Sequence, residues 1–178
     1  ESAAPTLKRI TLELGGNDAA IVFPDVDVEE TATSVFWGAF SNSGQICTAT
    51  KRAYVHEDIY EPFKAKMIEL AGQIKVGPAS EQGSMLGPVQ NKPQYERVKN
   101  LLEDCKAQGY TVITPGTAPD AGYFIPLTLV DNPPENARIV QEEQFGPVLP
   151  LIKFSDEDDV IARTNATAQV ERLHTFLA

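Results

Sequence analysis

The stretch AAIVFPDVDVEETATSVFWGAF, residues 19–40, sets the strand–helix pattern from which the fold is predicted. Its first five residues, 19–23, form an apolar run typical of a strand buried on both faces of a sheet. The acidic segment PDVDVEE then offers a side chain to cap a helix, and the apolar residues after it lie near helical spacing. We therefore predict a buried strand followed by a helix that packs inward.

The same alternation continues on both sides of this stretch. Upstream, RITLELGG places Ile10, Leu12 and Leu14 on one side and predicts a further strand. Downstream, we predict strands over 52–56, 110–114, 125–131 and 148–154, helices over 59–74, 92–109 and 157–166, and a short amphipathic helix in the tail, 168–178. This order predicts an α/β fold: an open, mostly parallel sheet flanked by helices on both faces.

Length and composition limit the class of protein. A chain of 178 residues suits one domain with a packed core. The net charge of −10 argues against a nucleic-acid partner and gives an anionic membrane surface nothing to attract. No apolar run approaches the roughly 18 residues of a membrane span. Two cysteines far apart, with no secretory pattern, favour a reducing compartment, and we expect a cytoplasmic protein.

Cys47, in FSNSGQICTATKR, is the first candidate for chemistry. It is either a small buried hydrophobe, as most free cysteines are, or a nucleophilic thiolate. A histidine base could come from His56 or His174, although a solvated place at a strand end is the expected fate of His56. Cys105 lies on the apolar side of a predicted helix and is expected to be inert. No set of Cys and His residues has metal-ligand spacing, so we predict no metal site.

Two acidic motifs are the other candidates. Glu13 lies in LELGG, where it is either a solvated glutamate or a partly desolvated carboxylate that takes a proton from water. The glycines after it would let a ligand or another backbone approach closely. EEQFGPV, residues 142–148, places two acids before an aromatic residue, a turn and a strand. Alone, this motif is also typical of an ordinary helix end.

Taken together, these motifs resemble a known family. LELGGNDAAIVFPDVDVE, FSNSGQICTATKRAYVHEDIYEPF, GPVQNKPQYERV, GYFIPLTLVD and EEQFGPVLPLIKF follow one another in the order found in the catalytic domain of the NAD(P)-dependent aldehyde dehydrogenase superfamily. The resemblance runs from about residue 6 to residue 165. It implies that an aldehyde is oxidised to a carboxylic acid with NAD or NADP, through a cysteine thiohemiacetal and a thioester.

The resemblance also implies the residues that act. Cys47 would be the nucleophile, and its backbone N–H would donate to the oxyanion of the intermediate. Glu13 would be the general base. Glu143 and Phe145, together with Leu14 and Gly15, would bind the cofactor at its nicotinamide end. Asn165 would support the site structurally.

The chain departs from the family pattern in three places. We expect residues 1–167 to be the catalytic domain without the cofactor-binding domain, which would leave an apolar face bare and favour self-association or a cofactor-domain partner. Asn17 replaces the lysine usual after LELGG, a change we expect at the surface. The tail, 168–178, is expected to be unrelated to the family. Two alternatives stay open at this point: a cofactor-independent thiol esterase, and a non-catalytic remnant of the same fold.

Overall fold

The computed structural model describes residues 4–167 and, as backbone, residues 173–176. The helices are α1 (Val28–Phe40), α2 (Tyr60–Gln73), α3 (Lys92–Ala107), α4 (Arg138–Gln141) and α5 (Glu157–Asn165). The strands are β1 (Ala19–Val22), β2 (Arg52–His56), β3 (Thr111–Ile113), β4 (Thr128–Asp131), β5 (Val148–Phe154) and β6 (Leu173–Phe176). Three short 3₁₀ helices, Ala4–Thr6, Ser41–Gly44 and Glu57–Ile59, complete the described elements.

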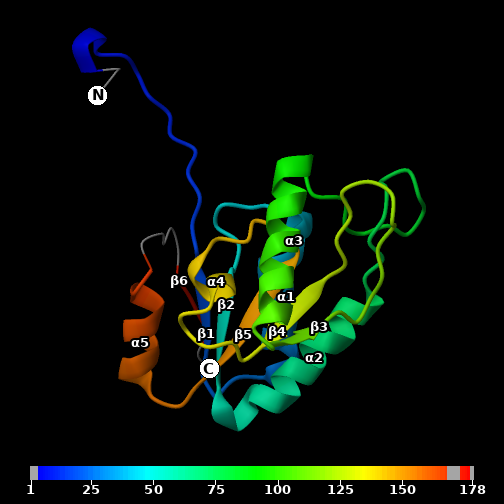
Figure 1. Cartoon of the computed structure of the whole chain (residues 1–178). Coiled ribbons are helices and arrows are strands. Elements are labelled where there is room, and N and C mark those ends of the chain that lie inside the picture. Colours follow the sequence, from blue (N-terminus) through cyan, green and yellow to red (C-terminus); the bar gives the residue numbers. More distant parts are fainter. Residues whose placement is uncertain (1–3, 168–172, 177–178) are drawn as a thin grey trace.

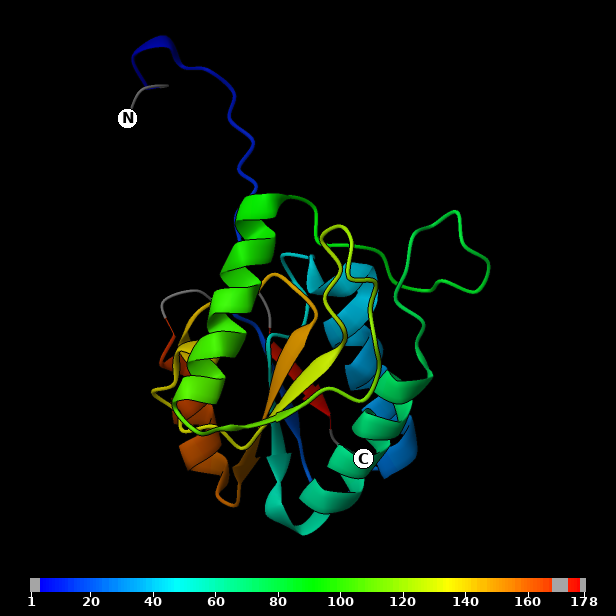
Figure 2. The ribbon, with the colours of Figure 1, turned by 45° about the vertical axis from the view of Figure 1, so that its right-hand side comes forward.

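The strands form one sheet in the order β3-β4-β5-β2-β1-β6. Every neighbouring pair is parallel except β3 and β4, which are antiparallel. Figure 2 shows α3 and α2 on opposite sides of this sheet. The predicted open, mostly parallel sheet with helices on both faces is confirmed.

Alternating side chains of the central strands supply two cores, one on each face of the sheet. On β1, Ala20 and Val22 join the cluster formed with α1 and α2, while Ala19 and Ile21 join the cluster formed with α3. Because both faces are covered, β1 carries no polar alternation, and this is why residues 19–23 read as a continuous apolar run. Asp27 caps α1, accepting a hydrogen bond from the Glu30 N–H at 2.9 Å.

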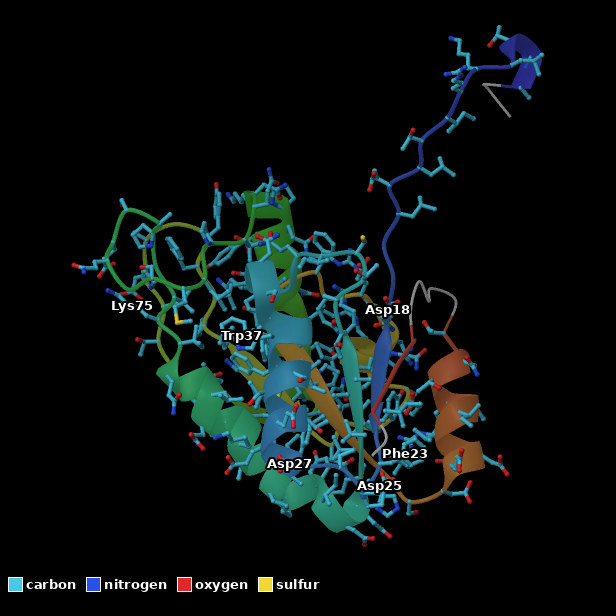
Figure 3. All side chains as sticks on the ribbon, turned by 180° about the vertical axis from the view of Figure 1, so that it is seen from behind. Asp18, Phe23, Asp25, Asp27, Trp37 and Lys75 are labelled. Carbon is cyan, nitrogen blue, oxygen red and sulfur yellow. The ribbon has the colours of Figure 1, made fainter. Side chains whose placement is uncertain are left out.

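The strand predicted upstream of β1 is wrong. Residues 7–18 form neither helix nor strand, and Figure 1 shows the segment leaving the body of the molecule as an extended arm. Ile10, Leu12 and Leu14 are more than half exposed, and Figure 3 shows the side chains of the arm standing clear of the sheet. Period-two alternation describes a chain that could pair, but a strand forms only beside a partner strand, and the described residues offer none there.

The helix predicted in the tail is also wrong where the structure describes it. Residues 173–176 form β6, which pairs in parallel with β1, Ala19 opposite Leu173. The backbone of β1 would otherwise be an open sheet edge, and β6 satisfies its hydrogen bonds. The rest of the expected helix, 168–172 and 177–178, lies outside the described residues. Within the described part of the chain, no helix is long and apolar enough to cross a membrane.

Candidate active site

Three segments that the sequence singled out meet at one edge of the sheet because each leads into a parallel strand. The end of the arm enters β1, the Cys47 segment enters β2, and residues 143–147 enter β5. These strands are neighbours in the order β5-β2-β1 and run parallel, so their starting ends lie side by side. The fold therefore places the three segments at the amino-terminal edge of the sheet.

These segments line one open pocket with a volume of about 560 Å³. All six residues predicted for catalysis and cofactor binding contribute to its wall: Cys47, Glu13, Glu143, Phe145, Leu14 and Gly15. Gln45, Ile46, Gln94 and Arg97 complete the lining. Asn165 does not belong to it and lies exposed at the end of α5.

The Cys47 segment has an unusual backbone. Asn42, Ser43 and Gly44 are consecutive residues in the left-handed region, with φ of 52°, 56° and 72°. A Cβ at Gly44 would lie 2.2 Å from the carbonyl oxygen of Gly146, so only glycine fits this close approach to the segment that enters β5. The left-handed run turns the chain sharply after α1 and leaves Cys47 partly exposed at the pocket.

Side-chain hydrogen bonds fix this turn to the neighbouring loop. The Ser43 hydroxyl donates to the Gly87 carbonyl at 2.8 Å, and the Gln45 side chain both donates to Pro88 and accepts from the Gln90 N–H. The position of the Cys47 segment is thus set by long-range contacts as well as by its own backbone.

The second carboxylate of the pocket, Glu143, is held against the glycine pair of the arm. The Gly16 N–H donates to Glu143 Oε1 at 3.2 Å, and a Cβ at Gly15 would lie 2.2 Å from Glu143 Oε2. A close approach does occur at Gly15, but it is made by the Glu143 side chain and not by the ligand or backbone expected from the sequence. Asn17 is fully buried and donates to the Val140 carbonyl at 2.9 Å, so the expected surface position for Asn17 is wrong.

Two residues of α3 hold the segment that carries Glu143 and Phe145. Gln94 Nε2 donates to the carbonyls of Gln144 and Phe145, and Arg97 Nη2 donates to the carbonyl of Glu143. Neither Gln94 nor Arg97 was predicted to act at the site. Their spacing of three on a helix, which places them on one face, was the available signal.

Glu13 lies in the exposed arm, so its environment in this structure is the solvated one of the two that the sequence allowed. His56 is at the far end of β2 from the Cys47 segment. It accepts a hydrogen bond from Asp58 N–H and packs edge-on against Phe154, with 5.3 Å between ring centroids. The side chain of His174 lies outside the described residues.

Cys105 behaves as expected of a core residue. It is fully buried in the cluster between α3 and the sheet. Burial, reinforced by the nearby Asp104 carboxylate, raises the pKa of the Cys105 thiol to about 11. A thiol in this state is a poor nucleophile at neutral pH.

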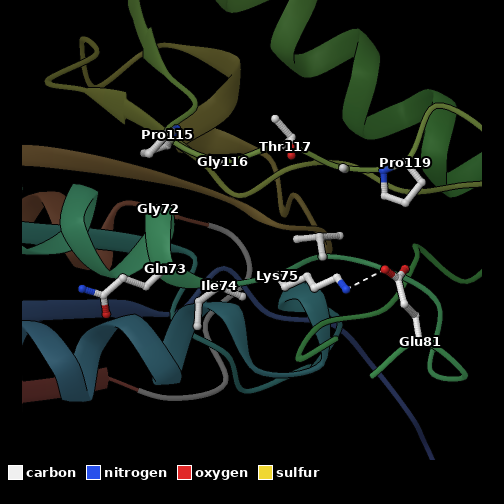
Figure 4. A pocket seen from close by; sticks show the side chains of 11 residues that line it. Gly72, Gln73, Ile74, Lys75, Glu81, Pro115, Gly116, Thr117 and Pro119 are labelled. Atoms are coloured by element: carbon white, nitrogen blue, oxygen red, sulfur yellow. Dashed lines mark hydrogen bonds and ion pairs between the residues drawn. The ribbon is translucent and has the colours of Figure 1, made fainter. Parts of the chain in front are cut away.

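A second hollow, between the end of α2 and the loop after β3, contains none of the predicted site residues (Figure 4). Its charged side chains are Lys75 and Glu81, which pair with each other at 2.6 Å and are half exposed. Among the residues that the structure describes, no group of three or more His, Cys, Asp or Glu side chains could hold a metal ion.

Fold and pocket together define an α/β domain whose candidate site is centred on a cysteine, at the edge where three parallel strands begin. The model of the aldehyde dehydrogenase family matches residues 1–170. A probable aldehyde dehydrogenase from Pseudomonas sp. is 49% identical over 166 residues, covering 93% of this chain and 34% of that protein. The mitochondrial aldehyde dehydrogenase of Leishmania tarentolae is 42% identical over 92% of this chain and 33% of its own.

Solved structures agree with the sequence matches. The NAD+ complex of the aldehyde dehydrogenase from Bacillus cereus superposes with a TM-score of 0.86 and 34% identity, covering 96% of this chain and 36% of that one. The chain belongs to the aldehyde dehydrogenase family. It spans about a third of the length of the relatives that it matches.

Proposed function

We propose that this chain supplies the nucleophile, the general base and the nicotinamide-end contacts for oxidation of an aldehyde to a carboxylic acid with NAD or NADP. The observation that carries the proposal is the single pocket lined by Cys47, Glu13, Glu143 and Phe145, which come from three separate segments. The names of the relatives, all aldehyde dehydrogenases, support the same reaction.

Cys47 performs the first step in this proposal. Its thiolate sulfur forms a bond to the aldehyde carbon, and the carbonyl electron pair moves to oxygen, giving a thiohemiacetal oxyanion. The Cys47 N–H is available to donate to that oxyanion, since this N–H has no hydrogen-bond acceptor within the described residues. Glu143 and Phe145 would hold the nicotinamide end of a bound cofactor, which would supply the acceptor for the hydride lost from this carbon as the Cys47 adduct becomes a thioester.

Glu13 acts in the second step. It takes a proton from the water that attacks the thioester carbonyl carbon, the carbon–sulfur bond breaks, and the Cys47 thiolate and the carboxylic acid separate. Because the arm leaves Glu13 exposed, its carboxylate is accessible to water.

The residues present fit one end of the cofactor. Glu143 offers carboxylate oxygens suited to ribose hydroxyls, and Phe145 offers an aromatic ring in the pocket that Cys47 also lines. The sequence contains no G-x-G-x-x-G turn that would cradle the cofactor phosphates. We therefore propose that this chain holds the nicotinamide end, and that the choice between NAD and NADP rests on other residues.

The direct test is formation of reduced cofactor from a short aliphatic aldehyde, with NAD and then with NADP, by the longest natural protein that contains these 178 residues. We expect turnover that is lost in Cys47→Ala and strongly slowed in Glu13→Gln. Turnover that survives Cys47→Ala would overturn the proposal.

The isolated chain provides a second test. If Cys47 and Glu13 suffice for acyl transfer, the chain will cleave an activated ester without any cofactor, which is the thiol-esterase alternative. An unreactive Cys47 would instead favour the non-catalytic remnant. The exposed apolar residues of the arm are consistent with self-association or a cofactor-domain partner, a prediction that sedimentation of the chain would check.

A further inference from the structure

Lys51 is a charged residue whose side chain is buried beside the Cys47 segment. Only 2% of its surface is exposed. A buried ammonium is costly unless it is well hydrogen-bonded or paired. Its backbone N–H donates to the carbonyl of Asp18, the residue before β1, at 2.8 Å, which anchors Lys51 to the start of that strand. From this fixed point the side chain reaches back to the Cys47 turn.

The ammonium binds the turn at two main-chain oxygens. Lys51 Nζ donates to the Ile46 carbonyl at 2.5 Å and to the Gly44 carbonyl at 3.2 Å. It also lies 5.3 Å from the centroid of the Phe145 ring, within the range of a cation–π contact. One side chain therefore connects the left-handed turn, the residue before Cys47 and the aromatic residue of the pocket.

The contact with Ile46 bears directly on Cys47. The Ile46 carbonyl and the Cys47 N–H belong to the same peptide group. A cation that binds the oxygen of a peptide group polarises that group and makes its N–H a stronger donor. The Ile46 oxygen also accepts from the Ala49 N–H at 3.1 Å, which adds to the polarisation and fixes the peptide plane.

We propose that Lys51 is a positioning residue that strengthens and orients the Cys47 N–H as a donor to the reaction oxyanion. The proposal rests on the function proposed above, in which this N–H meets the thiohemiacetal oxyanion. Lys51 touches neither substrate nor sulfur in this account, and its effect passes through the Ile46–Cys47 peptide. It follows that Lys51 matters for reactions of Cys47 that create an oxyanion, and much less for reactions that do not.

Two reagents separate these cases on the 178-residue chain. Acylation of Cys47 by 4-nitrophenyl acetate passes through a tetrahedral oxyanion. Alkylation of the same sulfur by iodoacetamide displaces iodide and forms no oxyanion. For Lys51→Met, which keeps most of the length of the side chain without its charge, we expect acylation to slow about tenfold, less than loss of a direct oxyanion donor. We expect alkylation to change by less than about twofold.

The controls keep the proposal falsifiable. Lys51→Arg retains a cationic donor and should restore part of the acylation rate, while Lys75→Met, at the exposed pair in the second hollow, should change neither rate. Lys51→Gln serves as a neutral variant that keeps an N–H donor, should Lys51→Met unfold.

An equal loss of both rates in the Met and Gln variants, including loss through unfolding, would show a purely structural role and overturn the proposal. Acylation that stays at the wild-type rate would overturn it as well. Failure of the proposed function itself looks different: wild-type chain and Cys47→Ala would then release nitrophenolate at the same rate.

Discussion

The two cysteines of this chain occupy opposite kinds of environment. Cys47 lies in an irregular turn at the edge of the sheet, partly exposed, among polar groups that come from distant segments. Cys105 lies on a regular helix, fully buried among apolar side chains. The difference predicts that Cys47 is the more reactive thiol, because burial in the core shields Cys105 from solvent and raises the pKa of its thiol.

The largest effect on acylation should come from removing the Cys47 thiol, and removal of the Cys105 thiol is the matched comparison. Cys47→Ala should lower acylation by 4-nitrophenyl acetate by at least roughly a thousandfold, because the nucleophile is lost. Cys105→Ala should leave the rate within about twofold, since its thiol does not reach the pocket. The burst of nitrophenolate measures both. Acylation that depended on Cys105 would break the comparison.

The thiols should also differ in labelling. With iodoacetamide at neutral pH, we expect Cys47 to react at least about a hundredfold faster than Cys105, because burial raises the pKa of Cys105 to about 11 and shields its sulfur. Mass spectrometry of the two peptides gives the ratio. In denaturant the ratio should fall toward one. Equal labelling in the native protein would contradict the account.

Two glycines with positive φ test the backbone around each thiol. Gly44, three residues before Cys47, has φ of 72° and faces the Gly146 carbonyl, whereas Gly109, just after α3, has φ of 77° and open space. Gly109→Ala should cost about 1–2 kcal/mol of the free energy of unfolding, the cost of a left-handed alanine. Gly44→Ala should cost about 3 kcal/mol or more, because the backbone must also move. Urea unfolding compares them, and equal losses would show that the Gly146 contact is unimportant.

A stability change away from both thiols provides the reference, and it should have the smallest effect on the two cysteines. Burial opposes ionisation of Asp131, but hydrogen bonds from Tyr60 at 2.6 Å and Lys64 at 2.9 Å outweigh it and hold the pKa of Asp131 below its ordinary value. The resulting stabilisation is complete above the unfolded pKa of about 3.9 and is lost as the pH falls through the folded pKa.

Asp131→Asn should therefore lower the free energy of unfolding at neutral pH by about 1–2 kcal/mol and flatten its fall in acid. The labelling ratio of the two cysteines should not change. A changed labelling ratio would mean that the pocket responds to general stability. Unfolding curves at several pH values measure the loss of free energy and its dependence on pH.

The sequence predicted the parts of the fold that burial controls. The strands at 52–56 and 148–154 form with the expected bounds, because runs of buried apolar residues between turns permit few other structures. That the candidate site residues lie close together could be predicted for a related reason. Cys47 and Glu143 each precede a strand, and adjacent parallel strands bring such positions together.

The parts that were missed depend on contacts with distant residues. Whether residues 10–14 form a strand depends on a partner, and so does β6, which forms beside β1. The sequence around Lys51 does not indicate that its ammonium is buried against the turn. That position depends on the hydrogen bond to the Asp18 carbonyl and on the left-handed residues before Cys47. The roles assigned to Glu13 and Cys47 stay predictions until chemistry is measured.

The central claim is that the pocket at the start of β1, β2 and β5 oxidises an aldehyde through Cys47. Its most direct test is mass analysis of the Glu13→Gln variant, in the longest natural protein that contains this chain, after incubation with an aldehyde and NAD or NADP. We predict an acyl group on the peptide that carries Cys47, heavier by the aldehyde less two hydrogens, formed in equal amount with reduced cofactor. Reduced cofactor without that adduct, or an adduct on another residue, would contradict the claim.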